Sequence, residues 1–312
     1  MVAIIAHRGA SAYLPEHTLP AKAMAYAMNA DFLEQDVVAT RDDELVILHD
    51  IHLDRVTDVA ERHPDRARAD GRYYVRDFDL DELRSLNVTE RLDSTGQAVF
   101  PGRFPARTGR FRIHTLAEEL TLVAGLNQAT GKETGVYPEI KRPHWHRQEG
   151  FDISAAVIQV LAEHGYRDAE DQIFLQCFDA GELLRVRNEL DCRMRLVQLI
   201  GENRWAETET DYDYLKSKQG LAELAETVDA IGPWVNQLYT VDPVGGKPAS
   251  TGLTESAHQA GLLVHPFTFR ADDLPPGFGC FEDMVHFFTG DLRIDGLFTD
   301  FPDRVFRYLL GA

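Results

Sequence analysis

Short β-rich runs alternate with longer helical stretches along most of the chain. The short runs predict eight strands, at residues 2–6, 31–37, 135–140, 172–177, 194–199, 228–232, 262–267 and 294–298. The stretches after them predict eight helices, near residues 16–29, 115–130, 150–164, 179–190, 219–227, 252–260, 282–289 and 302–310. Two starts are well marked, because Thr115 and Glu118 have the spacing of a capping box and Pro302 stands at a first helical position. Eight such pairs favour an α/β fold of the closed (β/α)8 TIM barrel type over an open doubly wound sheet.

The alternation breaks over residues 38–114. This stretch begins with a hairpin pattern from Val38 to Leu48 around Asp42-Asp43, and a polar excursion rich in Arg, Asp, Gly and Pro follows. An insertion after a barrel strand lands on the face that carries the chemistry. We therefore expect a single domain over residues 1–312, with a small cap at about residues 51–112 inserted after strand 2.

The composition narrows the range of partners. With a net charge of −19 and 44% hydrophobic residues among 312, the chain has an ordinary core content and no basic stripe for nucleic acid. No window approaches the roughly 18 uninterrupted apolar residues of a membrane-spanning helix. An anionic substrate would need a metal ion or an arginine to offset the acidic field. The expected partner is a small molecule, with neither nucleic acid nor membrane, and nothing indicates an oligomeric state.

The start of the chain and its cysteines bear on location. The run Val2–Ala6 is too short for a signal-peptide core, so we expect a cytoplasmic protein as the sequence stands, or a periplasmic one if a leader has been removed. Three widely spaced cysteines, Cys177, Cys192 and Cys280, make no disulfide framework.

Reactive side chains gather where the predicted strands end, which in a barrel is the face of the active site. These side chains are His7, Arg8, Glu34, Asp36, Glu139, Lys141, Gln176, Phe178, His265 and Asp300. Phe178 and Trp234 are candidates to line the pocket with Gln176, although an aromatic residue at a strand end is at least as often part of the core. Cys177 is out of phase with Gln176 and is expected to pack.

Glu34 and Asp36 point to one face of their strand because side chains alternate. Two carboxylates aimed into an apolar barrel repel one another, and a divalent cation would remove that cost. With Glu139 as a third carboxylate and no cysteine, the pattern suits a hard ion such as Mg²⁺ or Ca²⁺. The alternative is that these carboxylates only form ion pairs with Arg8 or Lys141.

Two histidines suggest acid–base chemistry. His7 and His49 each end an apolar run, and Asp50 follows His49 as a possible orienting partner. An in-line phosphoryl displacement needs one group to take a proton from the attacking oxygen and another to give one to the leaving alkoxide. Arg8 offers a bidentate fork to a phosphate oxygen. Taken alone, His7 is more often a structural histidine than a catalyst.

The segment Ala6–Ser11, continued by Leu14–Leu19, resembles the opening of the glycerophosphodiester phosphodiesterase family, and more narrowly the bacterial glycerol-metabolism branch, whose best-known members are periplasmic. The resemblance spans essentially the whole chain, excursion included, and the combination is more specific than any single piece. The segments that carry it further are Leu33–Val37, Leu48–Asp50, Leu53–Thr57, Tyr137–Lys141, Leu175–Phe178, Val264–Pro266 and Gly296–Asp300.

The resemblance implies a barrel enzyme with an inserted cap that hydrolyses glycerophosphodiesters, including the choline, ethanolamine and glycerol forms, to glycerol 3-phosphate and an alcohol. It implies one divalent cation, Ca²⁺ more than Mg²⁺. The implied metal ligands match Glu34, Asp36 and Glu139. The implied catalytic histidines and phosphate-contacting residues match His7, His49, Arg8 and Lys141.

Other functions stay open. An enzyme of the phospholipase D type acting on lysolipids would need an apolar channel or membrane-facing surface, and neither is visible. A non-catalytic barrel binding protein would be expected to have lost one of the reactive residues. A zinc hydrolase would use His144 and His146, which we expect in a loop after the third strand. Within the diester reaction, attack by water and attack by the substrate's own glycerol hydroxyl are equally compatible with these residues.

Overall fold

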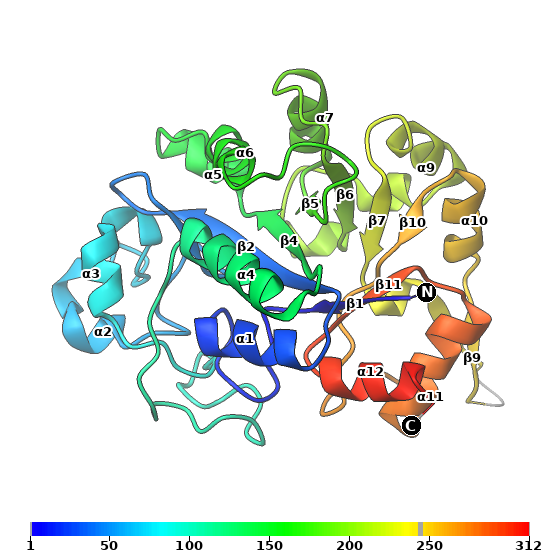
Figure 1. The fold of residues 1–312 in the computed structure, drawn as a ribbon, viewed down its shortest axis with the longest axis horizontal. Coiled ribbons are helices and arrows are strands. Elements are labelled where there is room, and N and C mark those ends of the chain that lie inside the picture. The colour runs from blue at the N-terminus through cyan, green and yellow to red at the C-terminus, as the bar shows by residue number, and fades with distance from the viewer. Residues whose placement is uncertain (1, 243–245, 312) are drawn as a thin grey trace.

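The computed structural model describes residues 2–242 and 246–311, and its centre is a nearly closed barrel of eight parallel strands (Figure 1). In sequence order these are β1 (Ala3–Ala6), β2 (Phe32–Ala39), β4 (Gly135–Ile140), β5 (Phe174–Cys177), β6 (Arg195–Ile200), β7 (Ala230–Pro233), β10 (Leu263–Val264) and β11 (Gly296–Thr299). Neighbours in this order pair along the sheet from β2 to β10, and β1 lies between β2 and β11. The gap between β10 and β11 is bridged by backbone bonds, such as the one from Asp295 N to Val264 O at 3.0 Å. The predicted barrel is confirmed.

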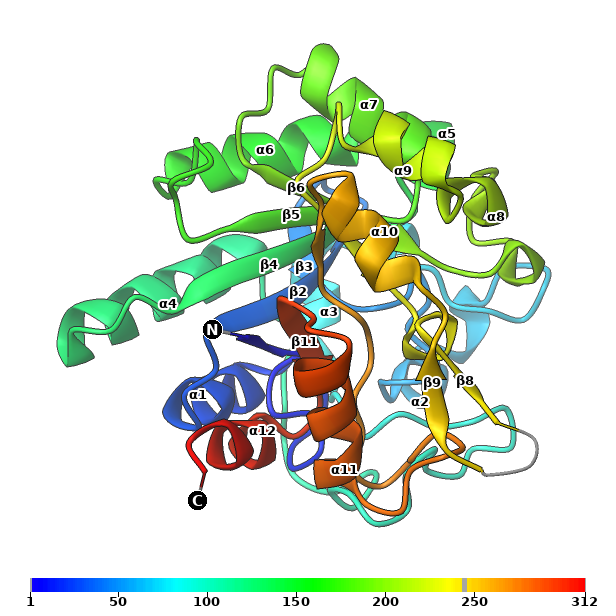
Figure 2. The same cartoon turned by 90° about the vertical axis from the view of Figure 1, so that its right-hand side faces the viewer.

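Helices surround the strands on the outside, as the two ribbon views show (Figures 1 and 2). The longer ones are α1 (Leu19–Ala27), α4 (Leu116–Thr130), α6 (Ile153–Glu163), α7 (Ala180–Asn188), α9 (Lys218–Leu224), α10 (Leu253–Gln259) and α12 (Pro302–Leu309). The shorter ones are α2 (Val59–Arg62), α3 (Leu80–Ser85), α5 (Pro143–Gln148), α8 (Tyr212–Leu215) and α11 (Phe281–His286). None in the described part of the chain is long and apolar enough to cross a bilayer.

Local signals account for most boundaries. The capping box at Thr115 and the proline start of α12 are both present. The predicted helix 16–29 was too long at its start, because the Thr18 side chain caps α1 by accepting from Ala21 N. Glu16 and His17 therefore precede the helix, and His17 has a left-handed φ of 55°. This early turn directs His17 toward the barrel mouth instead of along a helix.

A cluster of hydrophobic side chains inside the barrel forms its floor. The members of this cluster are Ile5, Phe32, Tyr137, Phe174, Val197, Ala230 and Phe298, all buried. His265, predicted among the reactive strand-end residues, belongs with this layer, because its Nδ1 lies 2.8 Å from the Tyr137 hydroxyl. Burial lowers the pKa of His265 to about 4. The floor is therefore filled, and a substrate has access only from above it.

The excursion folds on the outer end of β2. The predicted hairpin is present, since β2 pairs antiparallel with β3 (Leu45–Ile47). A second hydrophobic cluster, which includes Leu53, Val75 and Phe78, packs on Val38 and Val46 of this hairpin. We call residues 51–112 the cap; its helices α2 and α3 lie at the left of Figure 1. A separate two-stranded sheet is formed by β8 (Tyr239–Val241) and β9 (Pro248–Ser250).

Candidate active site

A cavity of about 190 Å³ opens at the carboxyl ends of the barrel strands. We call it the barrel-side cavity. Nine of the predicted site residues line it, namely His7, Arg8, Glu34, Asp36, His49, Glu139, Gln176, Phe178 and Trp234. Lys141, the tenth, borders a smaller adjoining cavity together with His49. Residues separated by more than 200 positions in the chain are thus brought to one opening.

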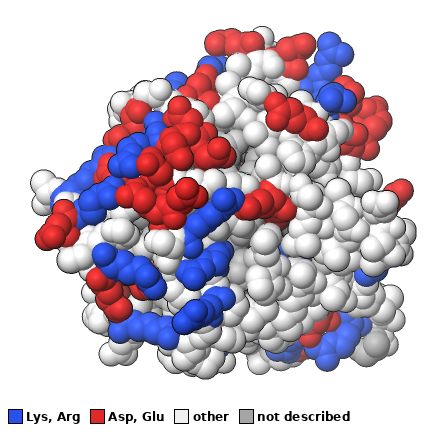
Figure 3. Space-filling model, turned by 60° about the vertical axis from the view of Figure 1, so that its left-hand side comes forward, with Lys and Arg blue, Asp and Glu red and all other residues white. Residues whose placement is uncertain are grey.

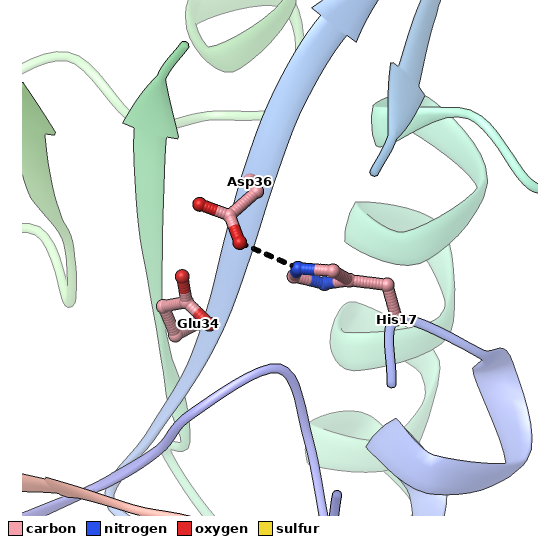
Figure 4. A group of neighbouring side chains, drawn as sticks. All are labelled: His17, Glu34 and Asp36. Atoms are coloured by element: carbon pink, nitrogen blue, oxygen red, sulfur yellow. Dashed lines mark hydrogen bonds and ion pairs between the residues drawn. The ribbon is translucent and has the colours of Figure 1, made fainter. Parts of the chain in front are cut away.

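The centre of the cavity is a pair of carboxylates on β2. Glu34 and Asp36 project from the same face of the strand, and Figure 4 shows His17 approaching them from the segment before α1. His17 Nε2 lies 2.7 Å from Asp36 Oδ2, and the Arg8 backbone N–H donates to Glu34 Oε2 at 2.5 Å. One donor atom from each of His17, Glu34 and Asp36 lies within 4.8 Å of the other two. This is the spacing at which side chains share a cation.

The electrostatics of the pair favour a bound cation. Burial, and then the charge of Asp36, raise the pKa of Glu34 well above its usual range. Burial also tends to raise the pKa of Asp36, but the positive charges of Lys141, His49 and His17 hold that pKa well below its usual range. Asp36 Oδ1 is buried and has no hydrogen-bond partner among the described residues. A divalent cation would supply the missing partner and remove the repulsion.

Glu139 stands slightly apart from this cluster. Its carboxylate lies 2.8 Å from Lys141 Nζ, which is also 3.6 Å from Asp36 Oδ1. Burial raises the pKa of Glu139 well above its usual range, and Asp36 adds to the rise. The ion pairs considered as an alternative to a metal site are therefore present for Asp36 and Glu139, whereas Glu34 Oε2 accepts from a backbone N–H of Arg8. The metal role of Glu139 stays a prediction.

Both histidines are oriented by a carboxylate. His7 Nδ1 lies 2.6 Å from Asp300 Oδ1, and His49 Nδ1 lies 2.8 Å from Asp50 Oδ1. Arg270 and His7 hold the pKa of Asp300 well below its usual range against the effect of burial, so this carboxylate accepts and His7 Nδ1–H donates. Each imidazole thereby keeps Nε2 for proton exchange.

The imidazoles are kept neutral by their surroundings. Burial, followed by the charge of Arg8, lowers the pKa of His7 to about 4. Burial, Arg8 and Lys141 together lower the pKa of His49. A neutral imidazole at neutral pH is ready to accept a proton.

Sequence reasoning gave no role to several residues of the site. His17 and Asp300 lie in the segments that carry the family resemblance. Their roles depend on contacts with Asp36 and His7, which are 19 and 293 positions away in the chain. Arg103 reaches from the cap to Asp300 at 2.8 Å and to Asp272 at 2.8 Å. No local pattern marks an arginine in a loop for such a contact, so only the fold reveals it.

Other candidates take their places around the cavity. Gln176 is buried, and its Oε1 has no partner in the described part of the chain. Phe178 lies beside Lys141, with Nζ 5.8 Å from the ring centre. Trp234 packs edge-on against Trp205 at 5.4 Å. These groups add polar and aromatic side chains to the lining of the cavity.

His144 and His146 do not form a zinc site. They lie in the short helix α5, not in the expected loop. His146 is buried, with Nε2 accepting from Ala39 N at 3.2 Å and Nδ1 3.1 Å from Arg142 O, so both its nitrogens are occupied. His144 pairs instead with Gln148 on the helix surface.

The surface around the cap carries both signs of charge. Figure 3 shows Lys and Arg side chains interspersed with Asp and Glu on this side of the molecule, next to a broad uncharged area. Cap residues take part in ion pairs such as Arg41 with Asp79 at 2.6 Å and Arg68 with Asp77 at 2.8 Å. The view offers no continuous basic surface of the kind a polyanion would need.

Comparisons with known proteins bear on the family and the fold of the chain. The model of the glycerophosphoryl diester phosphodiesterase family matches residues 7–304. A glycerophosphodiester phosphodiesterase of Haemophilus influenzae is 42% identical, with 99% of this chain and 90% of that protein covered, and one of Treponema pallidum is 34% identical, with 98% and 91% covered. The solved structure of an Oleispira antarctica phosphodiesterase, in complex with its product sn-glycerol-3-phosphate, is 18% identical with a TM-score of 0.64, covering 98% and 96%. At that identity the structural match supports the fold alone.

Proposed function

Because the chain belongs to the glycerophosphodiester phosphodiesterase family and is an enzyme of that activity, we propose that it hydrolyses small glycerophosphodiesters, such as glycerophosphocholine and glycerophosphoethanolamine, to sn-glycerol 3-phosphate and an alcohol. The observation that carries this proposal is the meeting of two carboxylate-oriented histidines with a buried carboxylate pair at one cavity. The product held by the Oleispira antarctica phosphodiesterase, which shares the fold, supports the choice of product.

The residues present suit one divalent cation. Glu34 and Asp36 would hold it, with Glu139 as a third carboxylate that exchanges its contact with Lys141 for the ion. When bound, the ion supplies Lewis-acid stabilisation of the charge that develops on the phosphoryl oxygens. We propose Ca²⁺ ahead of Mg²⁺, because Ca²⁺ tolerates irregular sets of oxygen ligands whereas Mg²⁺ demands a near-ideal octahedron.

Arg8 and Lys141 would position the phosphodiester. The Arg8 side chain is already held by Glu16 at 3.0 Å and lies 3.6 Å from Asp36, so its guanidinium is fixed at the rim of the carboxylate pair. Its buried Nε has no hydrogen-bond partner within the described residues and is free to donate to a phosphate oxygen. A phosphate there would lie between Arg8 and the two histidines.

His7 and His49 would move the protons. One Nε2 takes the proton of the attacking oxygen as the new oxygen–phosphorus bond forms. The other, whose protonated form the negative charge of the bound diester favours, gives its proton to the leaving alkoxide as the old ester bond breaks, so the pair ends with the proton exchanged between its members. Asp300 and Asp50 hold the two rings in the tautomer that this transfer needs.

An enzyme-coupled assay for glycerol 3-phosphate tests the proposal. Glycerophosphocholine and glycerophosphoethanolamine are supplied with Ca²⁺, with Mg²⁺ and with excess chelator. We expect release that the chelator stops and that Ca²⁺ restores better than Mg²⁺. A folded sample that releases no glycerol 3-phosphate with either ion contradicts the proposal. Phosphorus NMR of the same reaction detects a cyclic phosphate if the substrate's own hydroxyl attacks first.

A further inference from the structure

A second cavity, of about 230 Å³, opens beside the first, between the cap and the barrel. We call it the cap-side cavity. Its wall includes Glu90 and the apolar Phe100 of the cap. The two cavities share four residues, His7, Arg8, His49 and Arg270. A diester whose phosphorus lies at these shared residues therefore extends one ester arm into each cavity.

The two arms are not equivalent. Glu34, Asp36 and Glu139 line the barrel-side cavity and are absent from the described lining of the cap-side cavity. If the glycerol arm lies with the metal ligands, as the proposed function has it, the leaving alcohol occupies the cap-side cavity. At about 230 Å³ this space is below the roughly 300–1,000 Å³ of pockets for drug-sized ligands, so its occupant is small.

Four of the described arginines line the cap-side cavity; Arg8 is shared with the phosphate position, and the other three are already neutralised. Arg91 lies between Glu16 at 2.6 Å and Asp50 at 2.7 Å. Arg103 makes two such contacts with Asp272 and Asp300, both at 2.8 Å, and Arg270 also pairs with Asp300 at 2.8 Å. Because each guanidinium has its carboxylate, none of the three is left to attract an anionic headgroup.

Glu90 differs from the paired charges of this cavity, because one of its carboxyl oxygens has no partner in the described part of the chain. Its side chain is 4% exposed, and Oε2 has no hydrogen-bond partner among residues 2–242 and 246–311. Burial, and then the negative charge of Glu16, raise the pKa of Glu90 to about 7. A buried carboxyl oxygen without a donor is unfavourable, and a ligand that brings a donor relieves it.

We propose that Glu90 recognises the leaving alcohol through a primary ammonium group, so that the preferred substrates are glycerophosphodiesters of a short amino alcohol such as ethanolamine. The inference rests on the proposed function. An ammonium supplies an N–H donor for the unpartnered Glu90 Oε2. It also brings a positive charge to a carboxyl whose cationic neighbour, Arg103, is already paired with Asp272 and Asp300. Hydrogen bonds to charged groups are stronger than neutral ones. A quaternary ammonium has no N–H, and the Phe100 face that it would need is covered by Arg103 at 3.8 Å.

The test compares Glu90→Gln with wild type on two substrates, glycerophosphoethanolamine and glycerophosphoglycerol, whose leaving alcohol carries no charge. Glutamine has the shape of the protonated carboxyl, which is well populated near pH 7, so the variant is expected to fold. We expect the ratio of kcat/KM for the ethanolamine substrate to that for the glycerol substrate to fall about tenfold or more. Glu61→Gln, the same change on the exposed surface of the cap, is the matched control and leaves the ratio unchanged.

Equal losses on both substrates would assign Glu90 a structural role and overturn the inference, and so would an unchanged ratio. Both of these results can be obtained only if the wild-type protein turns over the two substrates. Absence of glycerol 3-phosphate from both substrates with wild-type protein is the separate failure that contradicts the proposed function.

Discussion

The barrel side and the cap side of the active-site opening are both densely charged, but their charges are arranged differently. On the barrel side, Glu34, Asp36 and Glu139 place three carboxylates together, and Asp36 Oδ1 has no donor among the described residues. On the cap side, Arg91 and Arg103 are each held between two carboxylates. In the proposed function a cation completes the barrel side, whereas the cap side is balanced except at Glu90.

This difference suggests that the barrel side carries out the reaction and that the cap side selects among substrates. A cluster of like charges costs free energy until an ion or substrate arrives, so it is suited to hold a reacting group. Paired charges are already satisfied and form a fixed wall, which shapes the space and gives little net attraction. We expect changes on the barrel side to affect turnover of every substrate, and changes on the cap side to affect the choice among substrates or the pH dependence.

The largest effect is expected from Glu34→Gln. The change removes one of the carboxylates that would hold the cation, and loss of metal stabilisation worth several kcal/mol lowers kcat/KM by about 10⁴-fold. Steady-state assays at saturating Ca²⁺ and a metal-binding titration measure both consequences. Glu133→Gln, an exposed residue before β4, is the matched control. Activity within tenfold of wild type would exclude Glu34 as a ligand.

The histidines come next. His7→Ala and His49→Ala are each expected to lower kcat by about 10³-fold, within the usual range for a lost general acid or base, with the metal still bound. A substrate whose leaving group is a nitrophenolate needs no protonation on departure. Activity on that substrate should recover in the variant that lacks the acid and stay low in the one that lacks the base. Full activity of either variant on the ethanolamine substrate would contradict the pairing.

The sequence predicted the barrel side well because regular strands fix the direction of a side chain. Alternation alone placed Glu34 and Asp36 on one face, and the carboxyl end of a parallel strand placed His7 and Glu139 near them. His17 was missed because the predicted helix began three residues too early, and the turn before Thr18 is what directs the His17 side chain toward Asp36.

The cap side could not be predicted in the same way. Glu90, Arg91 and Arg103 lie in irregular backbone, where no periodicity states which way a side chain points. Their partners are remote in the chain, as Arg103 and Asp300 are separated by 197 positions. The hairpin at β2 and β3 was predicted from its turn, yet the packing that it supports depends on long-range contacts.

Arg270→Gln tests a smaller, electrostatic effect at the boundary of the two cavities. Arg270 lowers the pKa of His7, so its removal favours the protonated imidazole and raises that pKa. With His7 as the group that accepts the proton, the acid limb of the kcat/KM profile should shift to higher pH by less than about one unit, since the arginine is partly exposed and screened. The variant loses activity near pH 5 and little near pH 8. Arg304→Gln, which breaks the ion pair with Glu282, is the control, and a limb that moves to lower pH contradicts the assignment.

The smallest effect should come from the surface ion pair between the cap and the barrel. Arg84 on α3 reaches Glu118 on α4 at 2.6 Å, with both side chains more than 40% exposed. Arg84→Ala is expected to change the free energy of unfolding by less than about 1 kcal/mol. Phe78→Ala, in the fully buried cluster that joins the cap to the hairpin, is expected to cost about 3–5 kcal/mol. Urea denaturation of both variants measures the contrast. If Arg84→Ala lowered the free energy of unfolding as much as Phe78→Ala, the stability of the cap would depend on its surface ion pairs. The paired arginines on the cap side would then be structural elements as well as part of the wall around the substrate.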